Sequence, residues 1–199
     1  MHFLYKNKIK IAYKKIIMQD LIEKILKEDK DFSESKFKAK VDNIFIQVYT
    51  AVMKKDLTRV KHFLSEELYK RFEQKIQILD DEGLIQVYGE LNVSDTEIVR
   101  IIENDESYEI EVKLLTKYLD YKLDKQTRNM VSGNDEVRVI KNMRLTFSKR
   151  KNAKDLGVAR KCPGCGANMD IAINGKCEYC GAIFKLEEYD WVLSELQNY

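Results

Sequence analysis

The spacing of apolar residues divides the chain into a helical half and a strand-rich half. Up to about residue 80 the apolar residues recur every three or four positions, as on one face of a helix. After Gly83 they tend to alternate with polar residues, as in a strand that buries one face. Helices followed by a run of strands predict an α+β fold in which helices pack on one face of a curved antiparallel sheet.

The first predicted helix is basic and amphipathic. It runs from Ile9 to Leu26, with lysines on much of the face opposite the apolar side chains. The apolar positions are Ile9, Ala12, Tyr13, Ile16, Ile17, Leu21 and Ile25. Such a helix either docks on its own domain or lies on an anionic membrane surface or in the groove of a partner. In the second interpretation Lys6, Lys10 and Lys14 are the candidate contacts.

Three more helices are expected before the strands. Ser33 can cap the first of them, whose stripe of large apolar residues is typical of a core-facing helix. The stripe consists of Phe37, Val41, Ile44, Phe45, Val48 and Val52. A short helix is predicted to start at Asp56, and another at Ser65, with Leu68, Phe72, Ile76 and Leu79 facing inward.

The second half contains several strand-like segments. Residues 84–93 and 97–102 are rich in β-branched residues, and Tyr108, Ile110, Val112 and Leu114 alternate with polar neighbours. A further strand carries Val137, Val139, Met143, Leu145 and Phe147, with a bulge expected near residues 140–142. Residues 132–135, Ser-Gly-Asn-Asp, favour a turn, so the last two strands are predicted to form an antiparallel hairpin around it. Trp191, near the end of the chain, is expected to pack into the core.

All four cysteines lie in two Cys-x-x-Cys units, Cys162 with Cys165 and Cys177 with Cys180. Each unit lets two sulfur atoms reach one ion, and four thiolates form a closed tetrahedral zinc site. The sequence therefore predicts one structural zinc ion in a small ribbon over residues 160–186. Iron with the same ligands and a redox dithiol are the alternatives. A closed tetrathiolate leaves no position for water, which argues against hydrolytic metal catalysis.

Charge limits the classes of partner. Charged residues make up 34% of the chain, but 35 basic against 33 acidic residues leave a net charge of only +2. This balance argues against non-specific coating of nucleic acid, which needs a surplus of cations. Residues 148–161 are locally basic, so a nucleic-acid-binding zinc ribbon stays as an alternative function. The apolar runs are too short for a secretion signal or a membrane span, and the expected location is cytoplasmic, with peripheral membrane association.

An enzyme or small-ligand binder is the third hypothesis. His62, Asp120 and Asp124 are candidate acids or bases, but the sequence does not assign any of them to a pocket. His62 has no second histidine or cysteine near it in sequence, so a core position is the more ordinary interpretation.

Several short segments resemble the C-terminal domain of the mitochondrial inner-membrane translocase subunit forty-four, in its bacterial branch with a zinc ribbon. They are residues 31–37, 52–57, 63–69 and 191–193. The resemblance implies a cystatin-like cone with an apolar pocket between helices and sheet, no catalytic residues, and preceding helices that contact anionic lipid. It favours a non-enzymatic scaffold or adaptor that docks on a membrane surface or a protein partner. The expected parts are a basic helical segment 1–30, the α+β domain 31–150, the ribbon 160–186, and a segment 187–199 that returns to the domain.

The cysteine ribbon gives the first testable prediction. We expect the native protein to contain one equivalent of zinc and Cys162→Ser to lose it, because removal of one thiolate opens the tetrahedral site. Metal analysis of both proteins measures the zinc, and far-UV circular dichroism follows the α+β domain, which should stay folded. Unfolding of the whole variant would contradict a ribbon that is independent of the core.

Overall fold

The computed structural model describes residues 16–30, 32–151, 167, 179 and 190–198. A helix over residues 16–28 comes first. The elements that follow are α2 (Glu34–Lys54), the short 3-10 helix η1 (Lys61–Phe63), α3 (Glu66–Asp81), β1 (Leu84–Glu103), β2 (Ser107–Asp124), β3 (Met130–Arg150) and β4 (Val192–Asn198).

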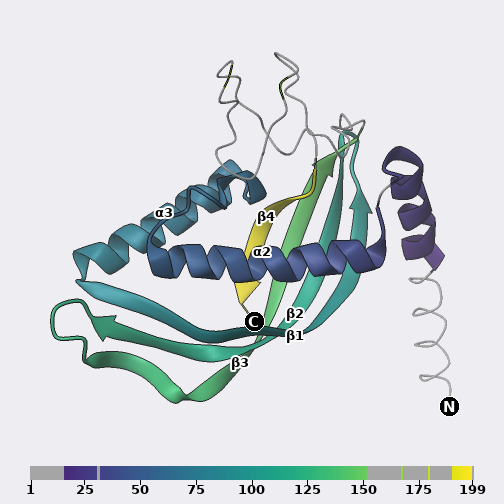
Figure 1. The fold of residues 1–199 in the computed structure, drawn as a ribbon. Helices are drawn as coiled ribbons and strands as arrows, with labels where there is room; N and C mark the ends of the chain where they lie inside the picture. The colour runs from purple at the N-terminus through teal and green to yellow at the C-terminus, as the bar shows by residue number, and fades with distance from the viewer. Residues whose placement is uncertain (1–15, 31, 152–166, 168–178, 180–189, 199) are drawn as a thin grey trace, which may run out of the picture.

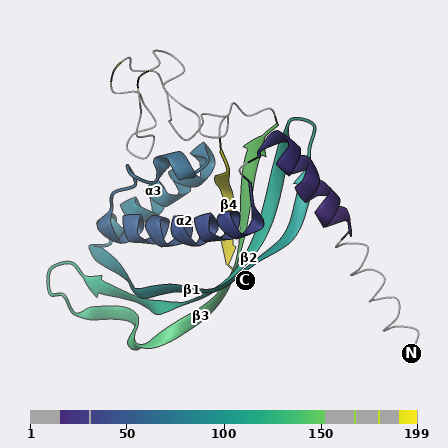
Figure 2. The same ribbon diagram turned by 45° about the vertical axis from the view of Figure 1, so that its right-hand side comes forward.

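The four strands form one antiparallel sheet in the order β1-β2-β3-β4. The sheet is curved, and α2 and α3 lie on the same side of it (Figure 1). The predicted fold class, α+β with helices on an antiparallel sheet, is therefore confirmed. Turning the molecule shows the helix over residues 16–28 at the end of the sheet opposite α3 (Figure 2).

The core lies between α2 and the sheet. Ser33 caps α2 by accepting a hydrogen bond from the backbone N–H of Lys36 at 3.2 Å. The predicted apolar stripe of α2 is buried, and it meets inward-facing residues of β2 and β3. The fully buried apolar residues of β2 and β3 are Ile110, Val112, Leu114, Met143, Leu145 and Phe147. Because these positions alternate along their strands, the sheet buries one apolar face beneath the helix.

The segment around Trp191 joins α2 to the edge of the sheet. Trp191 is 3% exposed, and its ring centre lies 5.5 Å from that of Phe37. The preceding Asp190 forms an ion pair with Lys40 of α2. From there β4 pairs antiparallel with β3 over Met143 to Ser148. The expected core position of Trp191 thus follows from both aromatic packing and strand pairing.

The helix over residues 16–28 packs its apolar side on the end of the sheet. Ile25 is 2% exposed, and Met18, Leu21 and Ile22 pack against the core. Ile16 and Ile17 stay exposed. The predicted amphipathic helix is therefore docked on its own domain over its described part.

Polar contacts reinforce this docking. Glu103 at the end of β1 accepts hydrogen bonds from Lys24 at 2.6 Å and from Lys151 at 2.9 Å. The Tyr108 hydroxyl donates to Glu28 at 2.9 Å. Lys149 donates to Asp29, which follows the helix, at 2.7 Å. These contacts connect the docked helix to the ends of β1, β2 and β3.

The prediction of a helix that starts at Asp56 is wrong. The structure has turns there, followed by the three-residue η1. The Asp56 carboxylate accepts a hydrogen bond from the backbone N–H of Thr58 at 2.9 Å. A short side chain that bonds its own backbone in this way favours a turn over a continuing helix.

The hairpin of β2 and β3 is confirmed, but its predicted turn is wrong. The turn covers residues 125–127, where Asp124 accepts hydrogen bonds from the backbone N–H groups of Gln126 and Thr127. Residues 132–135 lie within β3. There Gly133 takes a positive φ of 89°, and Asn134 accepts from the backbone N–H groups two and three residues ahead. The turn-forming residues thus bend a strand instead of reversing the chain.

The bulge predicted near residues 140–142 is also misplaced. Pairing is regular there, with Ile140 opposite Lys117 and Asn142 opposite Leu115. The two irregularities lie nearer the tip, one between the Tyr118–Val139 and Asp120–Asn134 pairs and one between the Lys122–Ser132 and Leu123–Met130 pairs. The two β-branched segments 84–93 and 97–102 belong to one strand, β1, interrupted by three register shifts. The local sequence did not distinguish a break between two strands from a bulge within one strand, because both need the same backbone freedom.

Within the part of the chain that the structure describes, no helix is both long and apolar enough to cross a membrane.

Two glycines with positive φ give a matched stability prediction. In Gly133→Ala the new Cβ would press on the Asp120 carbonyl oxygen and lie 2.5 Å from the Tyr121 Cα, with backbone strain added. We expect a loss of about 3 kcal/mol or more in the free energy of unfolding. Gly83→Ala has φ +65 but no atom within 4 Å of the new Cβ, so it should lose only about 1 kcal/mol. Urea unfolding of both variants measures the difference in the free energy of unfolding. Equal losses in the two variants would contradict the close packing of Gly133 against Asp120 and Tyr121.

Candidate functional site

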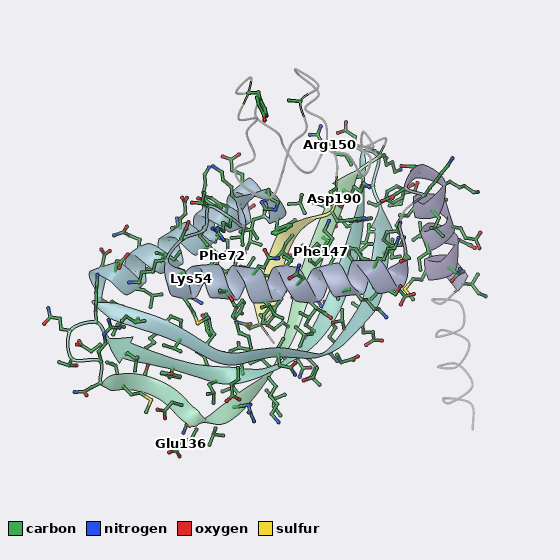
Figure 3. All side chains as sticks on the ribbon, in the orientation of Figure 1. Lys54, Phe72, Glu136, Phe147, Arg150 and Asp190 are labelled. Atoms are coloured by element: carbon green, nitrogen blue, oxygen red, sulfur yellow. The ribbon has the colours of Figure 1, made fainter. Side chains whose placement is uncertain are left out.

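A groove lies between α3, α2 and the end of β4. Its volume is about 430 Å³. The lining residues are Tyr49, Leu68, Arg71, Phe72, Lys75, Leu196, Gln197 and Asn198. Phe72 of α3, labelled in Figure 3, lies on the helix-covered side of the sheet, as does Phe147 of β3. The groove therefore lies on the helix-covered side of the sheet.

A second opening of about 290 Å³ adjoins the first along α3. Arg71 and Lys75 line both openings, and Gln86 of β1 and Lys122 of β2 complete the second with α3 residues. Arg71 and Lys75 are four residues apart on one helix, so their side chains are neighbours on its surface. Both α3 cations border the buried stripe of Leu68 and Phe72 and are thereby held beside the core.

Three tyrosines from three elements form a buried cluster next to these openings, and one of them, Tyr49, lines the first opening. The ring centre of Tyr49 on α2 lies 4.7 Å from that of Tyr88 on β1 and 5.8 Å from that of Tyr118 on β2. Tyr88 and Tyr118 meet edge to face at 5.7 Å. All three are at least 94% buried, with 6% or less of their surface exposed. Aromatic pairs in this geometry stabilise the core beyond their burial alone.

Two lysines reach this aromatic cluster. Lys75 donates to the Tyr88 hydroxyl at 2.7 Å, and its ammonium lies 5.4 Å from the centre of that ring. Lys141 of β3 lies 5.4 Å from the centre of the Tyr118 ring. Cations over aromatic faces are attracted by the negative charge of the ring face. Tyr88 and Tyr118 are thus each in contact with a lysine ammonium, whereas the Tyr49 hydroxyl donates to the Met143 sulfur.

Asp120 is the carboxylate of this network. It accepts hydrogen bonds from Lys141 at 2.6 Å and from the Gln86 side chain at 2.9 Å. Burial lowers the pKa of Lys141, but Asp120 and Tyr118 outweigh this effect and the net pKa is raised. Asp120 and Lys141 therefore compensate each other's charge, while Arg71, Lys75 and Lys122 are the basic residues that line the openings.

Burial also shifts the pKa values of residues in and next to the groove. It raises the pKa of Tyr49 and Tyr88 above the ordinary tyrosine value, with neighbouring tyrosines and Asp120 contributing in the same direction. It lowers the pKa of Lys75, because a desolvated ammonium is disfavoured. These shifts mean that the hydroxyls stay protonated and can donate hydrogen bonds.

The sequence-predicted acids and bases fall in different places. Asp120 lies in the network just described, whereas Asp124 holds the β2–β3 turn. His62 is 8% exposed and its ring lies 3.8 Å from that of Phe63, in η1. The structure therefore brings one of the three predicted residues, Asp120, into the polar network beside the groove, and it does not line either opening.

The metal and membrane candidates are not placed. The metal ligands Cys162, Cys165, Cys177 and Cys180, and the candidate contacts Lys6, Lys10 and Lys14, lie outside the described residues. Among the residues that are described, no group of three or more His, Cys, Asp and Glu side chains is arranged to hold a metal ion.

Sequence reasoning missed most of the groove and the tyrosine cluster next to it. Tyr49, Lys75, Tyr88, Tyr118 and Lys141 come from five elements that are separate in sequence. One signal was present, since Arg71 and Lys75 flank the apolar positions Leu68 and Phe72 at helical spacing. That spacing predicts two cations at the border of a buried face.

Most of the chain matches one known protein family. Residues 18–157 match the profile of one protein family, described as the Tim44-like domain. A similar solved structure is the crystal structure of the intermembrane space region of the chloroplast protein ARC6, at 8% sequence identity and a TM-score of 0.38. That similarity covers 81% of this chain and 95% of the other. A comparison with curated proteins gives no match.

The buried tyrosines predict loss of stability at high pH. A tyrosine whose pKa is raised in the folded state stabilises the protein fully below pH about 10, the unfolded value, and less as pH rises above it. Tyr108, whose pKa is raised to about 12, contributes stability that is lost as the pH rises from about 10 to about 12. In an alkaline titration followed by phenolate absorbance, we expect Tyr49 and Tyr88 to ionise only as the protein unfolds.

Tyr88→Phe identifies the contribution of one hydroxyl. In the variant, the increase in phenolate absorbance that accompanies unfolding should be smaller, and the rest of the alkaline titration should not change. If it instead removes a reversible titration near pH 10 while circular dichroism shows native protein, the buried hydroxyl is not protected in the way the structure requires.

Proposed function

We propose that this chain, which belongs to the Tim44-like domain family, is a non-enzymatic adaptor that docks on an anionic membrane surface or on a protein partner. The observation that carries the proposal is the family match, which runs from the docked helix through β3 and covers most of the chain. The family indicates a translocation-related role in contact with membranes and proteins.

The docked helix limits where membrane contact takes place. Its apolar side chains Leu21, Ile22 and Ile25 pack against the core and so are not available to lipid. Ile16 and Ile17 are exposed at its start, next to the lysine-rich residues that precede them. We therefore assign the membrane contact to Lys6, Lys10 and Lys14 and to the apolar residues among them, not to the docked turns.

The four cysteines form the second part of the proposal. Two Cys-x-x-Cys units supply a donor set of four thiols, which suits a closed structural zinc site. Zinc held by Cys162, Cys165, Cys177 and Cys180 would fix the backbone of a short ribbon and supply no open coordination position for chemistry. In the adaptor the ribbon is a rigid contact surface beside the α+β domain.

Vesicle flotation tests the membrane contact. Wild-type protein should float with vesicles that contain phosphatidylglycerol, and the triple variant Lys6→Gln, Lys10→Gln, Lys14→Gln should bind about 100-fold more weakly. This follows from about 1 kcal/mol of attraction for each basic residue near an anionic surface. Higher salt should weaken the wild type, since it screens exposed charges.

A matched variant separates this effect from net charge. Lys36→Gln, Lys113→Gln, Lys117→Gln removes three exposed lysines from α2 and β2 and should float like the wild type. Identical flotation of all three proteins, or none by the wild type, would refute the membrane contact.

A further inference from the structure

Half of β3 lies at a free edge of the sheet. β2 pairs with one side of β3 along most of its length, whereas β4 pairs with the other side only over Met143 to Ser148. No strand of the described residues pairs with this second side over residues 130–142. A strand with a partner on one side only presents unpaired N–H and C=O groups to any chain that reaches it.

The free edge carries exposed apolar side chains. All of residues 125–138 are exposed. Four large apolar residues of this half of β3 have between 48% and 65% of their surface exposed, namely Met130, Val131, Val137 and Ile140. Natural sheets commonly protect an edge with charged side chains, so apolar residues at this edge favour contact with a partner.

The outer edge of β1 is protected in that way. Three register shifts interrupt its pairing with β2, and no large apolar side chain of β1 is exposed. The exposed residues of β1 are all polar or charged, namely Glu90, Asn92, Ser94, Asp95, Glu97, Arg100 and Glu103. The free half of β3 is therefore the edge that is suited to pairing.

Charged residues flank the apolar residues of this edge in a defined order. Arg128 precedes Met130 and Val131, and Asp135 and Glu136 follow them. None of these three charged side chains forms an ion pair with a described residue. When two such segments run antiparallel, the cation of each lies opposite the carboxylates of the other, and the apolar residues meet between them. The edge is thus complementary to itself, which favours a second copy of this chain as the partner.

The register of this pairing follows from the charges. A two-fold axis at Ser132 places Arg128 of one copy opposite Glu136 of the other. The turn over residues 125–127 limits regular backbone pairing on one side, and the register shift after Asn134 limits it on the other. β4 pairs with β3 beyond this segment, so it does not block the second copy. A two-fold contact uses the same surface in both copies and therefore closes as a dimer.

We propose that two copies of this chain form a dimer by antiparallel pairing of β3 over residues 128–136. Met130 and Val131 lie at the centre of the contact, and Arg128 lies opposite Asp135 and Glu136 at each end. Glu136, labelled in Figure 3, lies on the part of β3 that is distant from α2 and α3, where a second copy has access. The contact is short, so we expect a Kd in the micromolar range, as for interfaces below about 1,200 Å². The dimer goes beyond the adaptor function.

Sedimentation velocity of the full chain at a series of concentrations measures the dimer. Arg128→Glu places like charges opposite each other at both ends of the contact, and we expect it to raise the Kd of the dimer at least about tenfold. Asp135→Lys, Glu136→Lys places cations opposite Arg128 and should raise the Kd by a similar factor.

A mixture of the two variants tests the register. An antiparallel contact brings position 128 of each copy to positions 135 and 136 of the other. In the mixed dimer every substituted side chain therefore lies opposite one of opposite charge, and the unchanged residues retain their contact. The equimolar mixture should recover the wild-type Kd to within about threefold, although each variant alone is weakened.

Hydrogen exchange tests the backbone pairing. The amide N–H groups of residues 130–134 should exchange more slowly in the wild type than in Arg128→Glu at a concentration where only the wild type dimerises. Those of β1 should exchange equally in both proteins. Equal exchange at residues 130–134 would contradict pairing through this edge.

A control variant and the possible outcomes complete the test. Arg59→Glu makes the same change of charge at an exposed turn outside the edge and should dimerise like the wild type. Circular dichroism confirms that each variant is folded. A wild type that stays monomeric up to about 1 mM, a dimer that neither edge variant weakens, or a mixture without recovery would overturn the proposal. Vesicle flotation depends on Lys6, Lys10 and Lys14, so failure of the dimer and failure of the adaptor function give different results.

Discussion

The packing of α2 on the sheet is the contact on which the rest of the structure depends. Its aromatic and aliphatic side chains fill the concave face, where Phe37 meets the Phe147 ring edge to face at 5.5 Å. The same α2 residue contacts Trp191, so this one interaction also holds the segment that leads into β4. Burial of large apolar side chains is the dominant favourable term in such a fold. The edge strand and the groove beside it are therefore positioned by the α2–sheet core.

The inner face of the sheet changes chemistry along its length. Beneath the first part of α2 it carries aliphatic residues such as Ile110 and Leu145, whereas toward α3 it carries Tyr88, Tyr118 and Asp120. Polar groups in this position must find hydrogen-bond partners, and Gln86 and Lys141 supply them for Asp120. The second opening, which Gln86 and Lys122 line, lies at this polar end of the sheet.

The docked helix and the groove lie at opposite ends of the sheet (Figure 2). The helix is held by one buried side chain, Ile25, by three partly buried neighbours, and by polar contacts of Glu28, Asp29 and Glu103. Such contacts at the surface are individually weak, so they orient the helix more than they stabilise it. The arrangement places the docked helix and the groove beside α3 on two separate parts of the molecule.

The sequence by itself determined the main helices and the strand-rich half, because the spacing of apolar residues follows the period of burial, but it wrongly predicted a helix at Asp56 and divided β1 into two segments. It predicted α2 from Ser33 and its stripe, α3 from Ser65 and Leu68, and the pairing of β2 with β3. It misplaced the turn, because residues 132–135 suit a reversal and a bulge equally well, and only the pairing of Asp120 with Asn134 decided between them. It also left open whether the basic helix docks on its own domain, which the burial of Ile25 decided. Only the tertiary structure brought Tyr49, Tyr88 and Lys75 together, since residues from α2, β1 and α3 become neighbours through packing and not through any periodicity within one segment.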